Sequence, residues 1–354
     1  MLALPTLATP SAVALVAAGI DATVKAGVVA GVAAALAWLL RRAPARVRYR
    51  VWLGALMVTA LAVCLALMNA VLAEWRGGYS ALVALPADAV PASIWRLVVW
   101  GWALGALAHA GRTAVGLVLL ARDRQRLPIA AERTWRRLVK SAGASLGLRG
   151  DVRILYGADD AIPMCWGLVR GTILVPARAA RWTRRLRQAV VLHECAHLRR
   201  RDPLVMLAEQ IVSALLWFHP AIWIIVAHLR RERELACDAT VVAAGVRPDV
   251  YARLLVTLAR SCRPLAAPAH AIVQTLGLEY RIAALLAGDV SGVPARHQRV
   301  ALTVGVVFAL FTVTRVIATT APLDGVAATL APRVTAQPGE SPASFRAGLF
   351  GAAR

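Results

Sequence analysis

The sequence predicts a mainly α-helical membrane protein with about four transmembrane helices and a cytoplasmic α+β domain. Two observations carry this prediction. First, 59% of the 354 residues are hydrophobic, which is a high share for a soluble protein. Second, the apolar residues gather in long runs, and clusters of arginine flank several of these runs. Such clusters orient membrane helices, because cytoplasmic loops carry an excess of positive charge.

Three membrane helices are predicted in residues 1–121, at about 20–40, 51–73 and 97–121. The second run contains no charged residue and is long enough to cross a bilayer. Arginines follow the first run at 41–50 and the third run at 122–126. We therefore expect both of these loops to face the cytoplasm and the N-terminus to lie outside.

Residues 122–299 have a mixed pattern that is typical of a globular unit, and we expect them to form the cytoplasmic domain. Their predicted elements are a helix at about 131–144, a strand at 151–156, and a hairpin of strands at 164–168 and 172–175. A fourth span is predicted at 300–320, because arginines precede an apolar run there. The remaining residues, 321–354, are rich in Ala, Pro, Thr and Ser and predict a short, disordered extracytoplasmic tail.

A candidate zinc site lies in the domain, where the sequence reads H-E-x-x-H. His193 and His197 are four residues apart and would lie one above the other on the same face of a helix. This spacing lets both imidazoles bind one tetrahedral zinc ion. Glu194 follows the first histidine and is suited to act as a general base toward a metal-bound water. Thr183 is the predicted N-cap of this helix, which should end near Asp202 and Pro203.

A third ligand is expected further along the chain. Glu234 can bind zinc, and Asp238, four residues later on the same helix face, can hydrogen-bond a ligating histidine. Glu232 is a competing ligand. Cys195 and Cys237 are alternative ligands, although small buried residues are the simpler interpretation of both. Two His and one Glu would leave a coordination position open for water, as in catalytic zinc sites.

The apolar run at 203–227 is also long enough to cross a bilayer. A single crossing would separate Glu234 from the two histidines. We therefore predict a helical hairpin that is buried in the domain or dips into the bilayer, with its reversal at Pro220. Glu209 should then face protein or water, because a lone charge facing lipid is costly.

In combination, these motifs resemble the BlaR/MecR-type integral-membrane zinc metallopeptidases, the antirepressor family of beta-lactam signalling. The resemblance covers roughly residues 27–320. Its marks are Ile162-Pro163, Trp166-Gly167, Ile173-Leu174-Val175-Pro176, the H-E-x-x-H stretch with Arg199-Arg200-Arg201-Asp202, Phe218-His219-Pro220, and Arg233-Glu234-Leu235-Ala236-Cys237-Asp238. It implies a zincin (gluzincin-like) metallopeptidase fold for the domain, with His193, His197 and Glu234 as zinc ligands and Glu194 as catalytic acid/base.

The resemblance implies a multi-pass protein of a bacterial-type inner membrane, with Zn²⁺ as its cofactor and an active site that faces the cytoplasm. The implied function is a metalloendopeptidase of signal transduction, with a transcriptional repressor as one candidate substrate. Membrane lipid, and a separate sensor protein or a second copy of the chain, are the other expected partners. We expect no direct nucleic-acid binding despite the net charge of +22, because no nucleic-acid-binding motif accompanies the arginines.

The sequence departs from the family pattern at its C-terminus. The beta-lactam sensors carry a penicillin-binding domain after the last membrane helix, which acylates a serine in S-x-x-K. Here about thirty residues follow the predicted fourth span, and the last lysine is Lys140. We therefore expect no covalent sensing of beta-lactams by this chain. Two other functions stay open: a membrane signalling or interaction protein with a structural or vestigial metal site, and a protease whose active site lies outside the cytoplasm.

Overall fold

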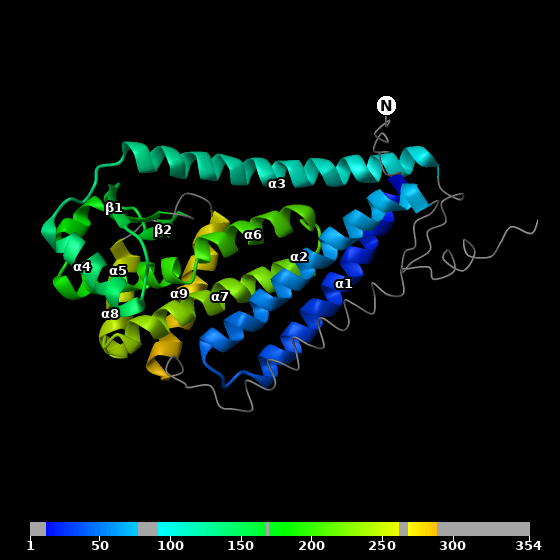
Figure 1. Cartoon of the computed structure of the whole chain (residues 1–354). Helices are drawn as coiled ribbons and strands as arrows, with labels where there is room; N and C mark the ends of the chain where they lie inside the picture. Colours follow the sequence, from blue (N-terminus) through cyan, green and yellow to red (C-terminus); the bar gives the residue numbers. More distant parts are fainter. Residues whose placement is uncertain (1–11, 77–90, 168–169, 262–267, 289–354) are drawn as a thin grey trace, which may run out of the picture.

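The computed structural model describes four stretches of the chain, residues 12–76, 91–167, 170–261 and 268–288. They form a bundle of long helices joined to a smaller unit that contains a three-stranded sheet (Figure 1). The predicted fourth span at 300–320 and the predicted tail at 321–354 lie outside the described residues.

Helices occupy the three segments for which membrane spans are predicted: α1 (Ala12–Leu39), α2 (Ala45–Arg76) and α3 (Ala92–Arg126). Each is long and apolar enough to cross a membrane. All three begin earlier than the predicted spans, since helical hydrogen bonding does not stop where the hydrocarbon ends. The first turns of α2, for example, contain Arg46, Arg48 and Arg50.

The pair formed by α1 and α2 packs through small residues. Ala22 and Ala26 of α1 and Ala66 and Ala70 of α2 are all buried in one apolar cluster. Small side chains allow two helix backbones to approach closely in a membrane. In contrast, α3 buries none of its residues within the described parts of the chain.

The apolar run at 203–227 forms the predicted hairpin, from α6 (Asp202–Leu215) and α7 (Pro220–Ala243). Pro220 begins the second helix, and the side chain of His219 caps it by accepting a hydrogen bond from the backbone N–H of Ala221 at 3.0 Å. The hairpin lies among the candidate membrane helices, with α6 against α3 and α7 against α2 (Figure 1).

Two contacts fix the tip of this hairpin to α3. The indole Nε1 of Trp102 donates a hydrogen bond to the carbonyl of Leu215 at 2.8 Å. The ring of Trp217 lies over Gly105, where an added Cβ would meet its nearest ring atom at 2.3 Å. The packing of α3 against the hairpin therefore requires glycine at this position.

The predicted environment of Glu209 is confirmed. Its side chain is buried in α6 and pairs with Arg233 and, at 3.2 Å, with Arg230. Both arginines lie on α7, so the ion pairs join the two arms of the hairpin. The carboxylate faces protein rather than lipid, as the cost of an isolated charge in hydrocarbon requires.

The smaller unit begins with α4 (Arg133–Leu146) and continues with β1 (Val152–Gly157), β2 (Met164–Trp166) and β3 (Gly171–Pro176), followed by the 3-10 helix η1 (Ala177–Arg181). The strand order is β1-β3-β2, with β1 parallel and β2 antiparallel to β3. The predicted hairpin is therefore present, and β2 is an edge strand of this sheet.

The other helices of this unit are α5 (Arg184–Arg199), α8 (Pro248–Ser261) and α9 (Pro268–Leu286). The N-cap prediction is confirmed, because the Thr183 side chain accepts a hydrogen bond from the backbone N–H of Leu186 at 3.3 Å. Arg201 adopts a left-handed conformation with φ of 59°, which turns the chain from α5 into α6. This turn lies next to the predicted helix end at Asp202.

Candidate metal centre

Helices α5 and α7 contact each other and bring three of the predicted site residues together. The Nε2 atoms of His193 and His197 lie 3.2 Å apart. Glu234, on α7, places Oε2 at 3.4 Å from His193 Nε2 and Oε1 at 3.6 Å from His197 Nε2. The two rings are nearly perpendicular to each other. The short distances show that both Nε2 atoms face the same small space.

This triangle has the dimensions of a zinc site. Zinc–ligand distances of about 2.0 to 2.1 Å in tetrahedral geometry place neighbouring ligand atoms about 3.3 Å apart. The side chain of Glu234 is 36% exposed, whereas those of His193 and His197 are 10% and 12% exposed. The three donors therefore fit one zinc ion and leave it accessible from the side of Glu234.

The other ring nitrogen of His193 is held by two residues. His193 Nδ1 lies 3.0 Å from the hydroxyl of Tyr251 and 3.3 Å from Oδ1 of Asp238. Because the tyrosine hydroxyl donates to Asp238 at 2.8 Å, it accepts from His193. Nδ1 therefore carries a proton, and Nε2 is the ring nitrogen that faces the proposed metal position.

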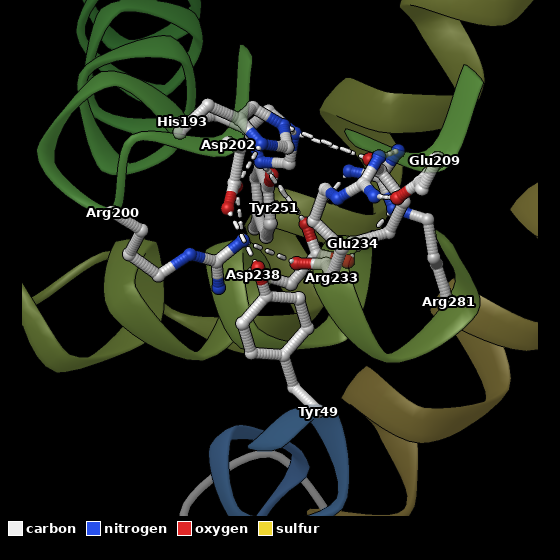
Figure 2. A network of polar contacts seen from close by, with 11 residues as sticks. Tyr49, His193, Arg200, Asp202, Glu209, Arg233, Glu234, Asp238, Tyr251 and Arg281 are labelled. Carbon is white, nitrogen blue, oxygen red and sulfur yellow. Dashed lines mark hydrogen bonds and ion pairs between the residues drawn. The ribbon is translucent and has the colours of Figure 1, made fainter. Parts of the chain in front are cut away.

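His197 has an equivalent support from a different helix. Its Nδ1 lies 2.7 Å from Oδ2 of Asp202, the first residue of α6. Figure 2 shows Asp202 in contact with Arg200 as well, and with Tyr49 of α2 at 3.2 Å. Each of the two histidines thus has a carboxylate close to its Nδ1 atom, and this carboxylate fixes the tautomer and the orientation of the ring.

Arg281, on α9, contacts both carboxylates of the site. Its guanidinium donates two hydrogen bonds to Asp238, at 2.8 and 2.7 Å, and its Nη1 lies 3.2 Å from Glu234 Oε2 (Figure 2). Two carboxylates from one face of α7 therefore share one cation from another helix.

The pKa values reflect this grouping of charges. Burial lowers the pKa of His193, but its hydrogen bonds to Asp238 and Glu234 outweigh burial and raise the pKa to about 9. Burial raises the pKa of Glu234, whereas its hydrogen bond to His193 and the charges of His197 and Arg281 bring it well below the usual range. Burial also raises the pKa of Asp238, but the charge of Arg281 and the hydrogen bonds to His193 and Arg281 outweigh burial and lower this pKa to about 2. Both carboxylates are therefore ionised at neutral pH and attract a cation.

Glu194 is buried on α5 next to the histidines and faces the edge strand β2. The thiol of Cys165, on β2, lies near this carboxylate. Burial raises the pKa of Cys165 well above its usual value, and the charge of Glu194 raises it further. The general base predicted from the motif therefore lies near the edge strand β2.

A comparison with known families bears on this site. The sequence matches the family described as BlaR1 peptidase M56 over residues 17–285, which is well over half of the chain. The chain belongs to this family. It is also 28% identical, over 79 residues, to the regulatory protein BlaR1 of Bacillus licheniformis. That match covers 22% of this chain and 13% of the length of BlaR1.

Family membership confirms the resemblance inferred from the motifs. The M56 family and the three apolar helices show an integral-membrane protein of a metallopeptidase family. The M56 match begins in α1 and ends in α9, so it includes both the candidate membrane helices and the metal centre.

Other residues considered as ligands of this M56 peptidase have different surroundings. Glu232 accepts a hydrogen bond from Arg48 of α2 at 3.0 Å, in a buried ion pair. Cys195 is buried in the apolar core of the smaller unit. Cys237 is closer, because its Sγ and one nitrogen of each candidate histidine all lie within 4.8 Å of one another. Burial raises the pKa of its thiol well above the usual value.

Proposed function

We propose that this M56 peptidase is a membrane-embedded zinc endopeptidase that cleaves a cytoplasmic protein in signal transduction. The observation that carries the proposal is the triangle formed by His193 Nε2, His197 Nε2 and Glu234. Glu194 follows His193 on the same helix. We assign the three as zinc ligands and Glu194 as the catalytic acid/base. Asp238 supports His193 through its second ring nitrogen.

The chain's own residues have distinct tasks in peptide hydrolysis. Zinc, when bound, supplies a Lewis acid that polarises a carbonyl and lowers the pKa of water. Glu194 accepts the proton of the attacking water and returns it to the leaving amine. Asp238 and Asp202 keep the Nδ1 protons of the two histidines in place, so that both Nε2 atoms stay available.

The unpaired edge of β2 in the described sheet is an argument for a protein as the substrate. Met164, Cys165 and Trp166 pair with β3 on one side only within the described sheet. An extended peptide can add to such an edge through backbone hydrogen bonds. Because Cys165 of β2 lies near Glu194, a peptide on β2 would bring its backbone close to the proposed general base.

The active site is proposed to face the cytoplasm of a bacterial-type inner membrane. Arginines at 41–50 precede or begin α2, and arginines at 122–126 end α3. The metal centre lies near the first turns of α2, because Tyr49 of α2 contacts Asp202, which supports His197. Positive loops face the cytoplasm. A transcriptional repressor is one candidate substrate, and the similarity to a protein named regulatory protein BlaR1 supports a regulatory target.

The test is cleavage by the purified full-length protein and its Glu194→Gln variant. We expect the variant to retain zinc and to lose roughly 10²- to 10⁴-fold in cleavage rate, the usual contribution of a general base. Glu279→Gln, at an exposed position on α9, is the matched control and should cleave normally. Undiminished cleavage by Glu194→Gln would contradict the mechanism. Comparing the proteomes of cells with wild-type and Glu194→Gln protein would identify the substrate.

The position of Cys237 favours a second candidate function, a signalling protein with a structural metal site. A thiolate from Cys237 would fill the fourth position, and four protein ligands are typical of structural zinc. Wild-type protein that holds zinc but cleaves neither itself nor casein would support this function. A Cys237→Ser variant that keeps both zinc and cleavage would exclude it.

A further inference from the structure

A line of polar contacts runs from the second membrane helix to the metal centre. The hydroxyl of Tyr49, in the second turn of α2, donates a hydrogen bond to Asp202 Oδ1 at 3.2 Å. The other oxygen, Oδ2, accepts from His197 Nδ1 at 2.7 Å. One buried carboxylate therefore links a residue of a candidate membrane span to a proposed zinc ligand (Figure 2).

The surroundings of Asp202 make this link rigid. Asp202 is fully buried and Tyr49 is 6% exposed. Arg200 contacts the carboxylate of Asp202, lies over the Tyr49 ring at 5.0 Å and donates to the carbonyl of Arg233 at 3.0 Å. A buried carboxylate is costly unless its oxygens are hydrogen-bonded. His197, Arg200 and Tyr49 supply the donors, each from a different direction.

A second contact holds the same turn of α2 against α7. Arg48, the neighbour of Tyr49, donates to Glu232 at 3.0 Å in a buried ion pair. Glu232 precedes the proposed ligand Glu234 by two residues on α7. The start of α2 is thus attached both to the first residue of α6 and to the helix that carries the third ligand.

The hydroxyl of Tyr49 has a separate role from its ring. A phenylalanine would fill the same volume and keep the contact with Arg200, so apolar packing does not require the hydroxyl. What the hydroxyl adds is a donor to Oδ1. Without it, the carboxylate of Asp202 is held by one fewer group and can rotate, and the ring of His197 would rotate with it. Supporting groups of this kind determine how tightly a histidine binds its metal.

We propose that Tyr49 is a positioning residue of the metal centre, so that a membrane helix takes part in metal binding through one hydrogen bond to Asp202. The proposal rests on the proposed function in one respect, that His197 is a zinc ligand. Beyond that function, the proposal states that the affinity of the site for its metal depends on the position of α2. A displacement of α2 in the membrane would move Tyr49, and the carboxylate of Asp202 would pass this movement on to His197.

The test compares Tyr49→Phe with wild type, as full-length protein in detergent. Two quantities are measured: the zinc dissociation constant, by competition with a chelator, and the visible absorption bands of the Co²⁺-substituted protein. Direct supports of a metal ligand change affinity about 10- to 100-fold, so we expect Tyr49→Phe, one bond further away, to weaken zinc binding about three- to tenfold. The cobalt bands should shift, because they report ligand geometry and not global stability.

Tyr156→Phe is the matched control. Its hydroxyl on β1 is also hydrogen-bonded to a carboxylate, that of Glu132 at 2.7 Å, and it has no contact with the metal centre among the described residues. Loss of this hydroxyl should leave the zinc dissociation constant and the cobalt spectrum unchanged. A shift equal to that of Tyr49→Phe would overturn the proposal.

Asp202→Asn tests whether the effect passes through Asp202. We expect this variant to weaken zinc binding about 10- to 100-fold, and we expect Tyr49→Phe to add nothing in its background, because both changes act on one contact. Additive effects, or a Tyr49→Phe variant identical to wild type in both measurements, would overturn the proposal alone. A wild-type protein that binds neither Zn²⁺ nor Co²⁺ would overturn the proposed function and this proposal with it.

Discussion

Arg281 Nη1 lies 3.2 Å from the Oε2 atom of Glu234, the proposed third zinc ligand. The same guanidinium holds Asp238, which supports the first ligand, His193. A single cation on α9 therefore pairs with two carboxylates of α7. Zinc would bring positive charge to the same place, so the protein depends most on Arg281 when no metal is bound.

We therefore expect Arg281→Met to destabilise metal-free protein more than zinc-loaded protein. Removing one partner of a buried ion pair costs about 3 to 5 kcal/mol, and zinc would offset part of the repulsion between Glu234 and Asp238. The measurement is thermal unfolding in detergent, with and without zinc. The stabilisation by zinc should be larger in Arg281→Met than in wild type.

Arg253→Met is the control for this prediction. Arg253 pairs with Asp249 at 2.8 Å on the surface of α8, with 77% of its side chain exposed. Exposed ion pairs contribute about 1 kcal/mol or less, so this variant should unfold like wild type. Equal zinc stabilisation in Arg281→Met and wild type would contradict a shared electrostatic role of Arg281 and zinc.

Asp238→Asn should weaken zinc binding. Asp238 is fully buried and contacts His193, Tyr251 and Arg281. An amide in its place cannot provide the charge that stabilises the His193 side chain, and we expect a loss of roughly 10- to 100-fold in zinc affinity. Chelator competition measures it. Asp249→Asn, at an exposed carboxylate, should bind zinc normally, and a normal affinity in Asp238→Asn would exclude a supporting role.

The residues proposed to carry the chemistry could be placed on common helix faces from the sequence, because helical spacing is local. The four-residue intervals from His193 to His197 and from Glu234 to Asp238 predict common helix faces, and the structure has both pairs on helices. The hairpin was also predictable, since one site cannot draw ligands from two sides of a membrane. The predicted reversal at Pro220 is confirmed at the start of α7.

The surrounding residues were not predictable in the same way. Asp202 lies five residues after His197, outside the spacing of one helix face, and only the left-handed turn at Arg201 brings it back. Arg281 and Tyr49 come from distant helices, and no motif marks either residue. Their contacts depend on tertiary packing, about which a single sequence carries little information.

Metal removal should lower the stability of the protein as well as its activity. A ligand that binds only the folded state stabilises it by about 2.7 kcal/mol at one hundred times its dissociation constant. We therefore expect the unfolding temperature to fall after chelation and to rise again with added zinc. In a His193→Ala/His197→Ala variant the unfolding temperature should not respond to zinc. If zinc still raised the unfolding temperature of that variant, the stabilising ion would bind at a site other than the two histidines.

Gly105→Leu should disturb the contact between α3 and the α6–α7 hairpin. A side chain at this position would collide with the ring of Trp217, whose nearest atom lies 2.3 Å from an added Cβ. Overpacking of this kind costs typically about 1 to 3 kcal/mol. Resistance to unfolding by an anionic detergent, or to heat in a mild one, is the measurement. Gly101→Leu, one turn earlier on α3 and with nothing within 4 Å of its added Cβ, should be neutral.

A double-mutant cycle distinguishes this collision from a general effect of leucine in α3. Trp217→Ala alone removes the ring and its hydrogen bond from Nε1 to the carbonyl of Trp102 at 3.3 Å, so it should destabilise the wild-type protein. In the Gly105→Leu background, Trp217→Ala also removes the clash with the leucine, so it should lower the stability by less than it does in the wild-type protein. Equal costs in the two backgrounds would mean that α3 and the hairpin do not pack through Gly105 and Trp217.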